Sequence, residues 1–351
     1  MAHSLDDPKT LSEIDPRGML KIIDAFPENC RQAIHSTEKM DINAIEGRRF
    51  SNLVIAGMGG SAVGGLLLRD WLQPTTHIPI IVTRDYSLPA FVSKESMVFC
   101  VSYSGNTEET LSSLNDALKR KASVICFSSG GKMEETSSQR GLPLIKLPSG
   151  FQPRAAIPQQ FFSLAVVAKR LNLIGHEWEE VEEAITILSE LRNELSPSNP
   201  NVKNEAKKLA TALMGYHPLI IGTRLLEGVA YRWATQLNEN SKSPACSAFI
   251  PEAFHNLIMA SEASPDLLGK ICIILLNDPE EKVQLPHKIE RFEKIVNKRF
   301  GKIVKVNARG KGRLARILST LLIGDYTSAY LAILYGKDPS SVSSIEELKR
   351  V

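Results

Sequence analysis

Short apolar runs alternate with amphipathic stretches over most of the chain, a pattern that indicates strands separated by helices. In the first half, strands are predicted at residues 53–56, 78–83, 97–101, 123–127 and 144–147. In the second half, they are predicted at 218–222, 271–275 and 302–306, followed by an apolar helix at 321–331. Strands and helices that alternate in this way form parallel, doubly wound sheets.

The strand–turn–helix theme of the first half restarts in the second, which suggests a weak internal duplication. Leu53–Met58 and Pro218–Gly222 are both apolar, and each leads into a helix. We therefore expect an α/β fold of two doubly wound parallel-sheet halves with flanking helices. The expected limits are a helical N-terminal segment 1–45, a first domain 46–175, a helical linker 176–200, a second domain 201–335 and a C-terminal helical tail 336–351.

A cluster of hydroxyl side chains follows the strand at 97–101, where the chain turns into a helix. The turn reads Ser102-Tyr-Ser-Gly-Asn-Thr107. Because the free N–H groups and positive end of a helix favour an anion, Ser102, Ser104 and Thr107 suit a phosphate. The turn has no lysine, unlike a nucleotide-binding P-loop. The expected ligand is therefore a phosphorylated small molecule, namely a sugar phosphate, although Thr107 also suits a plain helix cap.

A glycine-rich turn, Gly57-Met-Gly-Gly-Ser61, follows the first predicted strand. Its spacing matches the dinucleotide fingerprint G-x-G-x-x-A. That fingerprint needs an acidic residue about 20 positions later, whereas Asp85 lies at the end of the next strand, 28 residues after Gly57. We rank an NAD dehydrogenase last for this reason. The turn is interpreted as a place where Gly60 and Ser61 touch a ligand, with a purely structural turn as the alternative.

Three other segments carry side chains suited to acid–base chemistry. Glu239 lies off the apolar stripe of its helix, between two asparagines that favour a helix end. His255 follows Pro-Glu-Ala-Phe, and histidine titrates near neutral pH. Arg154 stands between two prolines that constrain the backbone. Taken singly, each has a structural alternative: a solvated carboxylate, a structural histidine and a surface arginine in a linker.

Composition narrows the functional classes. The 351 residues are 43% hydrophobic with a net charge of +3, and the basic residues are scattered, so we expect no nucleic-acid partner. No apolar run is long enough to span a bilayer, and the polar start has no secretory pattern, so we expect a cytoplasmic protein. Five cysteines without a CxxC pair indicate reduced thiols. No histidines lie at metal-ligand spacing, so we expect neither a metal nor a cofactor.

The two turns together resemble those of the sugar isomerase (SIS) domain family, on Gly59-Gly-Ser61 and Ser102-Tyr-Ser-Gly-Asn-Thr107. With Glu239 in Leu-Asn-Glu-Asn and His255 sixteen residues later, nearly the whole chain is similar to the bifunctional phosphoglucose/phosphomannose isomerase family. The resemblance implies interconversion of fructose 6-phosphate with glucose 6-phosphate and mannose 6-phosphate through an enediolate, without a metal.

The same resemblance implies residue roles. Ser102, Ser104 and Thr107 would hold the phosphate, with Gly60 and Ser61 beside the sugar. Glu239 would move the proton between C1 and C2, and Arg154 would stabilise the enediolate. His255 would assist ring opening in the site of the partner subunit of a homodimer with shared active sites. Lys349 would share this role, with Lys337 and Arg350 as the alternatives. Ser341, Ser343 and Ser344 are the candidates for the hydroxyl that admits mannose phosphate.

Two other classes compete with this interpretation. A non-catalytic phosphosugar sensor of SIS type usually carries a DNA-binding helix-turn-helix, for which residues 1–45 are too short and too weakly basic. A glucosamine-6-phosphate synthase needs a glutaminase domain with a cysteine just after Met1, where this chain has Ala2 and His3. We therefore expect an isomerase rather than either of these.

Overall fold

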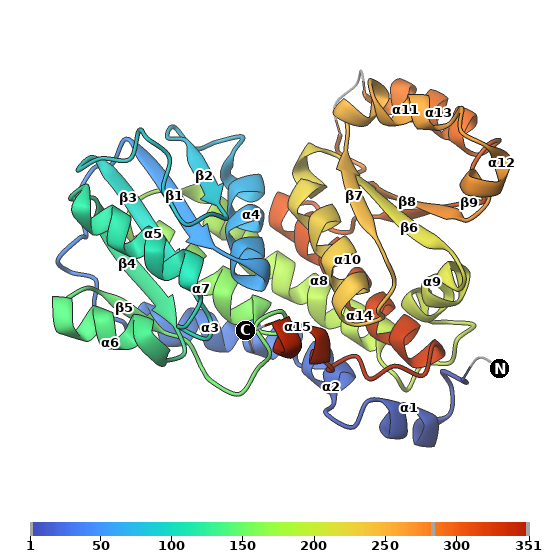
Figure 1. Ribbon diagram of the computed structural model, residues 1–351, viewed down its shortest axis with the longest axis horizontal. Coiled ribbons are helices and arrows are strands. Elements are labelled where there is room, and N and C mark those ends of the chain that lie inside the picture. The colour runs from blue at the N-terminus through green and yellow to red at the C-terminus, as the bar shows by residue number, and fades with distance from the viewer. Residues whose placement is uncertain (1–2, 282–284, 349–351) are drawn as a thin grey trace. The chain divides into compact units, whose positions relative to one another are not determined.

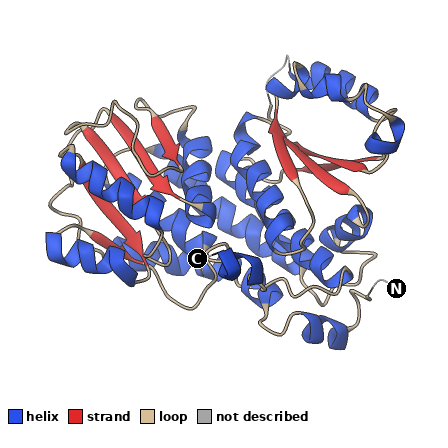
Figure 2. Ribbon diagram, in the orientation of Figure 1, coloured by secondary structure: helices blue, strands red, loops and turns tan. Residues whose placement is uncertain are grey.

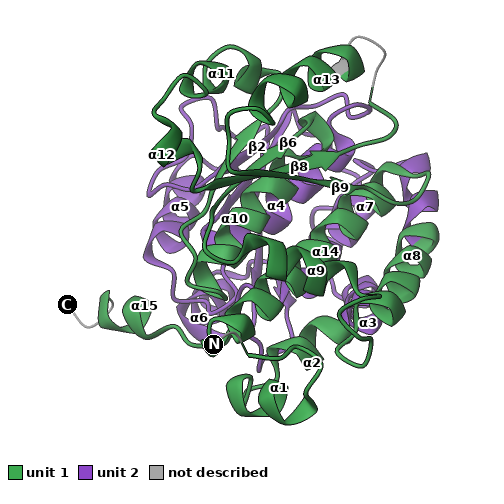
Figure 3. Cartoon of the chain, turned by 90° about the vertical axis from the view of Figure 1, so that its right-hand side faces the viewer, with its two compact units in different colours: residues 1–25, 182–351 green, residues 26–181 purple. Residues whose placement is uncertain are grey.

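The computed structural model describes residues 3–281 and 285–348. The chain forms two compact units, which Figure 3 colours separately: unit 1 comprises residues 1–25 and 182–351, and unit 2 comprises residues 26–181. Each unit contains one parallel sheet with helices around it (Figure 2). The predicted α/β fold with two doubly wound halves is thereby confirmed, whereas the exact domain limits stay predictions.

Unit 2 is built on a five-stranded parallel sheet in the order β2-β1-β3-β4-β5 (Figure 1). The strands are β1 (Asn52–Gly57), β2 (Ile80–Thr83), β3 (Ser96–Val101), β4 (Ser123–Ser128) and β5 (Leu144–Lys146). The helices are α3 (Phe26–Glu38), α4 (Gly59–Leu72), α5 (Glu108–Lys119), α6 (Gly131–Arg140), α7 (Ile157–Arg170) and the 3-10 helix η1 (His176–Glu179). In the register, Gly57 is paired with Val101, and Val101 with Phe127. The carboxyl ends of β1, β3 and β4 therefore meet at one edge.

Both faces of this sheet are covered, as expected for parallel strands that are apolar throughout. On one face, Val54, Val98 and Cys126 form a buried cluster with Leu114 of α5 and Met133 of α6. On the other face, α4 lies so close to the sheet that a Cβ at Gly65 would come within 2.9 Å of the Ile55 side chain. The helix α7 packs on α4 and on α3. The rigid sheet thus presents the turns at its carboxyl edge.

Unit 1 contains a four-stranded parallel sheet in the order β7-β6-β8-β9. The strands are β6 (His217–Gly222), β7 (Cys246–Phe249), β8 (Ile271–Asn277) and β9 (Lys302–Asn307). The helices are α1 (Pro8–Ile14), α2 (Met19–Asp24), α8 (Glu180–Leu195), α9 (Glu205–Leu213), η2 (Arg224–Leu226), α10 (Glu227–Glu239), η3 (Glu252–Phe254), α11 (Leu257–Ala260), α12 (Pro265–Leu268), α13 (Leu285–Val296), α14 (Arg313–Leu334) and α15 (Ser343–Leu348). Phe292 of α13 packs with Ile221 and Ile273 on one face, and α10 packs on β6, β7 and α14.

The two sheets share one connectivity, which supports the proposed duplication. In each, the first strand of the unit is flanked by the second and third, and the fourth follows the third. The sheet of unit 2 carries one further strand, β5. The strand β7 is the one strand that the apolar pattern did not predict, because it is a short and largely exposed edge strand with the sequence Cys-Ser-Ala-Phe.

The long helix α14 is longer than the segment 321–331 predicted from the sequence. Among the described helices, it alone has the length and apolar composition to cross a membrane, but its apolar window is 100% buried within the protein. A helix that is apolar on all sides and fully covered is typical of a core helix. It forms the centre of unit 1, where α9 and α10 pack against it.

Candidate active site

The predicted phosphate turn lies between β3 and α5 in unit 2. The Ser102 side chain is completely buried, that of Thr107 is half-buried and that of Ser104 is exposed. The Ser102 hydroxyl donates to Thr107 Oγ1 at 2.9 Å. The Ser104 hydroxyl accepts a hydrogen bond from the Asn106 N–H at 3.3 Å. The three hydroxyls therefore surround the start of α5.

Thr107 occupies the N-cap position of α5 but does not use its side chain to cap the helix. Its backbone is extended, as an N-cap requires, yet its hydroxyl makes no hydrogen bond to an N–H of the first turn. A plain cap would make that bond. The Thr107 hydroxyl instead lies beside Ser102, so side-chain capping does not account for a threonine at this position.

A second loop braces the phosphate turn from the end of β4. Gly105 and Gly131 both have positive φ, at 73° and 70°. A Cβ on Gly131 would come within 2.6 Å of the Ser104 carbonyl oxygen, so only glycine fits this contact. The Ser129 hydroxyl donates to the Tyr103 carbonyl at 2.6 Å, and the Met133 N–H donates to Gly105 O at 3.0 Å. These bonds fix the turn before any ligand binds.

The glycine turn after β1 lies next to the phosphate turn and to Arg154. The Ser61 hydroxyl accepts a hydrogen bond from the Tyr103 N–H at 3.3 Å. A Cβ on Gly60 would lie 2.8 Å from the Pro153 carbonyl oxygen and 3.1 Å from the Arg154 Cα. Arg154 itself is 4% exposed, which argues against the alternative of a surface arginine in a linker. Unit 2 therefore brings together all of its predicted site residues: Gly60, Ser61, Ser102, Ser104, Thr107 and Arg154.

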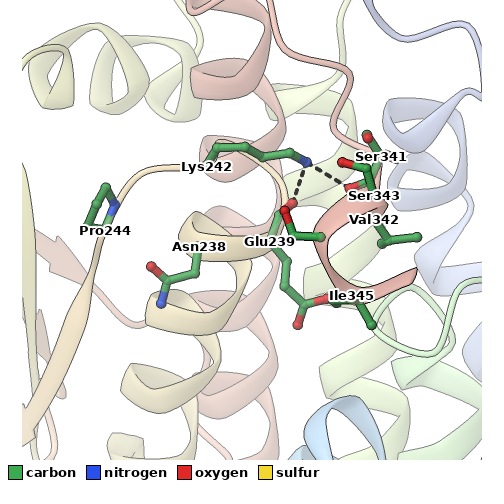
Figure 4. Close-up of a pocket in the computed structure, with 9 residues that line it drawn as sticks. Asn238, Glu239, Lys242, Pro244, Ser341, Val342, Ser343 and Ile345 are labelled. Atoms are coloured by element: carbon green, nitrogen blue, oxygen red, sulfur yellow. Dashed lines mark hydrogen bonds between the residues drawn. The ribbon is translucent and has the colours of Figure 1, made fainter. Parts of the chain in front are cut away.

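Glu239 is the last residue of α10 in unit 1, where it lines a cavity of about 450 Å³. The other residues lining it are Asn238, Lys242, Pro244, Ser341, Val342, Ser343, Ser344 and Ile345. Figure 4 shows the Glu239 side chain extending along the wall of the cavity toward Ile345. A cavity of this size is in the range of small-molecule sites. All three serines proposed to admit mannose phosphate line the same cavity as the predicted base.

Lys242 connects the end of α10 to the segment that precedes α15, and both line this cavity. Its ammonium group donates to Glu239 O at 2.6 Å, at the carboxyl end of α10, and to Ser341 O at 2.9 Å (Figure 4). A third bond reaches Asp338 O at 3.2 Å. A cation at the negative end of a helix is also electrostatically favourable. No pattern in the sequence points to this lysine, because its partners are backbone carbonyls, two of them about a hundred positions away.

Buried polar contacts with α14 hold the helix that carries Glu239. Arg232 and Asp325 form a two-pronged ion pair at 2.9 and 2.7 Å, and Gln236 donates to the same carboxylate at 3.2 Å. One turn further on, Asn240 donates to Ser328 Oγ at 2.9 Å. Burial raises the pKa of Asp325, while the Arg232 guanidinium opposes that rise. Because these contacts recur along α10 up to its end, they fix its rotation and hence the direction of Glu239.

The remaining predicted residues are His255 and Lys349. His255 follows η3 as its C-cap and is exposed, and it is not among the residues that line the Glu239 cavity. Lys349 lies outside the described residues. No group of three or more His, Cys, Asp or Glu suited to a metal ion occurs within residues 3–281 and 285–348. The predicted phosphate ligands thus belong to unit 2, and the predicted acid–base groups to unit 1.

Comparison with known proteins gives sequence relatives over nearly the full chain. A protein of Caldicellulosiruptor bescii named bifunctional phosphoglucose/phosphomannose isomerase is 37% identical over 332 residues, which cover 94% of this chain and 98% of the relative. Proteins of the same name from Aquifex aeolicus and Thermoplasma acidophilum are each 36% identical and cover 86% of this chain, with 90% and 89% of their own lengths. Residues 202–351 also match the family model of the bacterial phospho-glucose isomerase C-terminal SIS domain.

Solved structures share the fold at lower identity. A glucose-6-phosphate isomerase-like protein from Thermus thermophilus has a TM-score of 0.64 at 20% identity, covering 97% of this chain and 98% of its own. The C-terminal domain of the glucosamine-fructose-6-phosphate aminotransferase from Francisella tularensis has a TM-score of 0.68 at 18% identity, covering 92% and 98%. These similarities concern the fold alone.

Proposed function

The chain belongs to the bifunctional phosphoglucose/phosphomannose isomerase family, and on that basis we propose that it interconverts fructose 6-phosphate with glucose 6-phosphate and mannose 6-phosphate. The observation that carries the proposal is the pairing of two features in one chain. One is a lysine-free turn with three hydroxyls at the start of α5, and the other is a carboxylate, Glu239, at the wall of a cavity. A phosphorylated hexose needs the first for its phosphate and the second for its C1–C2 end.

The phosphate is held by Ser102, Ser104 and Thr107 in this proposal. Their hydroxyls, together with the first N–H groups of α5, offer neutral donors to the dianion. Gly60 has no side chain and Ser61 offers a hydroxyl, so both can lie against the sugar. This arrangement anchors one end of the substrate and leaves its other end free for chemistry.

The reaction itself is a proton transfer between neighbouring carbons. After the ring has opened, Glu239 removes the proton from C2 of the aldose, which gives an enediolate, and returns it to C1. The hydroxyl proton passes from O2 to O1 in the same sequence, which gives the ketose. No oxidant is needed, because the electrons stay within the substrate. Arg154 supplies the positive charge that stabilises the enediolate. A buried guanidinium is well suited to this role, because it remains charged at all working pH values.

Ring opening requires a proton to move from the O1 hydroxyl to the ring oxygen. We assign this step to His255 of the partner subunit in a homodimer, together with Lys349. The exposure of His255, and its position outside the Glu239 cavity, support a role in a neighbouring subunit. Ser341, Ser343 and Ser344 are the candidates for the hydroxyl that admits mannose phosphate, because they line that cavity. We place the enzyme in the cytoplasm, which fits its five free cysteines.

A coupled assay of the purified protein with fructose 6-phosphate tests the function. We expect both glucose 6-phosphate and mannose 6-phosphate to form, at rates that EDTA leaves unchanged. Saturable binding of fructose 6-phosphate without any product would instead show a sugar-phosphate sensor. A product pattern limited to glucose 6-phosphate would refute the dual specificity while keeping the isomerase chemistry.

A further inference from the structure

Tyr103 belongs to the phosphate turn, but its hydroxyl bonds to a distant backbone segment and is not one of the proposed phosphate ligands. The ring is 5% exposed. Its hydroxyl donates to Pro148 O at 2.8 Å and accepts from the Phe151 N–H at 3.0 Å. Burial raises the pKa of the Tyr103 phenol, so the group stays protonated and can make both bonds at once. The Tyr103 side chain therefore holds a segment of the chain that begins at Pro148, 45 residues later.

The segment so held runs from residue 148 to residue 154 and ends at Arg154. It contains no helix or strand of its own, since β5 ends at Lys146 and α7 begins at Ile157. A segment of this kind depends on side-chain contacts for its position. Tyr103 supplies two hydrogen bonds at its start and middle, and both go to backbone atoms, so they act on the path of the chain itself.

Two further contacts hold the other end of the segment. Gln160 Nε2, from the first turn of α7, donates to Pro153 O at 2.6 Å. Gly60 lies against the same carbonyl, so closely that a Cβ there would approach it to 2.8 Å. The segment that ends at Arg154 is thus held by contacts from the phosphate turn, from α7 and from the glycine turn. All of these contacts lie within unit 2.

We propose that Tyr103 is a positioning residue that couples the phosphate turn to Arg154, so that the guanidinium keeps a set distance from a phosphate bound on the turn. The inference rests on the proposed function, because it takes Arg154 as the group that stabilises the enediolate. The chemistry occurs several bonds away from the phosphate. An error of about 1 Å in that distance costs a rate factor on the order of 10². The binding of phosphate itself requires only the hydroxyls and N–H groups of the turn.

The variant Tyr103→Phe removes both hydrogen bonds and keeps the buried ring. We expect kcat with fructose 6-phosphate to fall by roughly 10-fold or more, in line with a displaced catalytic group. The KM, and the inhibition constant of inorganic phosphate as a competitive probe, should change by less than about threefold, since the phosphate ligands are untouched. The matched control is Tyr330→Phe, which removes another buried phenol bond, 2.7 Å to Leu195 O. It should leave kcat unchanged.

A double-mutant cycle separates positioning from general loosening. On an Arg154→Lys background, Tyr103→Phe should cause little further loss of kcat, because the group through which it acts has already been altered. If the two losses multiply in full, or if KM and the phosphate inhibition constant rise as much as kcat falls, Tyr103 only supports the turn and the proposal is wrong. The same holds if Tyr330→Phe lowers kcat equally.

Gln160→Leu is the second variant, should Tyr103→Phe fold poorly. It removes the bond to Pro153 O at the other end of the segment, and the same separation of kcat from KM is expected. Unchanged kcat in this variant, at unchanged stability, would overturn the coupling. If the wild-type protein forms no product from fructose 6-phosphate, the proposed function fails. With an active wild type, the inference about Tyr103 fails if kcat is insensitive to these changes, or if the double-mutant cycle or the Tyr330→Phe control gives one of the contrary results named above.

Discussion

In the site that we propose, single hydroxyl groups decide which anion the turn after β3 accepts. The hydroxyls of Ser102 and Thr107 contact each other at 2.9 Å, and that of Thr107 does not cap α5. A lysine in the same place would add a full charge and a long flexible side chain. The turn instead offers short donors at fixed positions, which distinguish a compact phosphate group by geometry. Its selectivity therefore depends on the exact placement of these hydroxyls.

The variant Ser102→Ala tests that placement. Because a hydrogen bond to a charged group contributes about 1.5–3 kcal/mol, KM for fructose 6-phosphate should rise roughly 10-fold or more. Steady-state kinetics gives the value. The control is Ser113→Ala in α5, which removes a hydroxyl of equal burial that donates to Asp85 O at 3.0 Å, away from the turn. Equal KM values in the two variants would contradict the assignment of Ser102 to phosphate.

Among the predicted site residues, the motif-bearing ones could be found from the sequence, whereas the burial of Arg154 could not. The hydroxyl turn is local, so its residues are neighbours in sequence as well as in space. The backbone of Arg154 lies against Gly60, which is 94 positions earlier in the chain. Lys242 was missed for the same reason, since its partners Asp338 and Ser341 are backbone carbonyls of a distant segment. Long-range contacts leave no periodic signal in a single sequence.

Elements that are apolar throughout were predicted well, and elements at an edge or with a charged end were not. The strand β7 has two exposed faces and contains a serine, so it lacks the apolar run of a central strand. The helix α14 was predicted too short because its first turn holds Arg313 and Arg316. Arg316 is nevertheless buried, in an ion pair with Asp278 at 2.8 Å. Charged residues are mostly exposed, so a buried arginine in an ion pair cannot be distinguished from a surface arginine in the sequence.

The packing of α10 on α14 depends on a glycine, Gly324, which leaves room for the ring of Trp233. A Cβ on Gly324 would lie 2.3 Å from Trp233 Nε1, and Trp233 is held there by a 2.9 Å hydrogen bond to Thr320 O. Gly324→Ala should therefore lower the free energy of unfolding by about 1–3 kcal/mol through overpacking. Urea unfolding measures the loss.

Gly64→Ala in α4 is the matched control for that substitution. Its added Cβ would meet Leu164 Cδ1 at 3.4 Å, an ordinary contact. Because alanine favours a helix interior over glycine, this variant should be about 0.5–1 kcal/mol more stable than the wild type. A stabilised Gly324→Ala protein would mean that the two helices are free to separate, and that α10 does not hold Glu239 firmly.

The two sheets of the molecule have the same strand order, but only the sheet of unit 2 is followed by the hydroxyl turn of residues 102–107 among the described residues. The sheets β2-β1-β3-β4 and β7-β6-β8-β9 have the same order. The turn after β3 has its hydroxyls, whereas β8 leads into Asp278, whose carboxylate is paired with Arg316. No cluster of hydroxyl side chains like that of residues 102–107 follows β8 in the described part of that loop. We therefore propose that unit 2 holds the phosphate and that unit 1 supplies Glu239.

Burial also sets the reactivity of the five cysteines. Four of them, Cys30, Cys100, Cys126 and Cys272, are buried, and Cys246 is exposed. Burial raises the pKa of Cys126 and of Cys272 to about 11, and it raises the pKa of Cys30 and of Cys100 well above the usual value of a thiol. Since the thiolate is the reactive form, these four should be inert in the folded protein.

Titration with a thiol-reactive chromogenic disulfide measures this difference. About one equivalent of the reagent per chain should react quickly in the native protein, because only Cys246 of the five cysteines is exposed. All five should react after unfolding. The variant Cys246→Ser should abolish the fast phase. Two or more fast equivalents in the native protein would show that one of the cores opens.

Replacement of Glu239 by glutamine tests whether this carboxylate moves the proton between C1 and C2 of a phosphorylated hexose. Glu239→Gln keeps the size of the side chain at the end of α10 and removes the base. Turnover of fructose 6-phosphate should fall by about 10²–10⁴-fold, the contribution typical of a general base, with KM little changed. A Glu239→Gln protein that forms glucose 6-phosphate and mannose 6-phosphate at rates near the wild type would contradict the account.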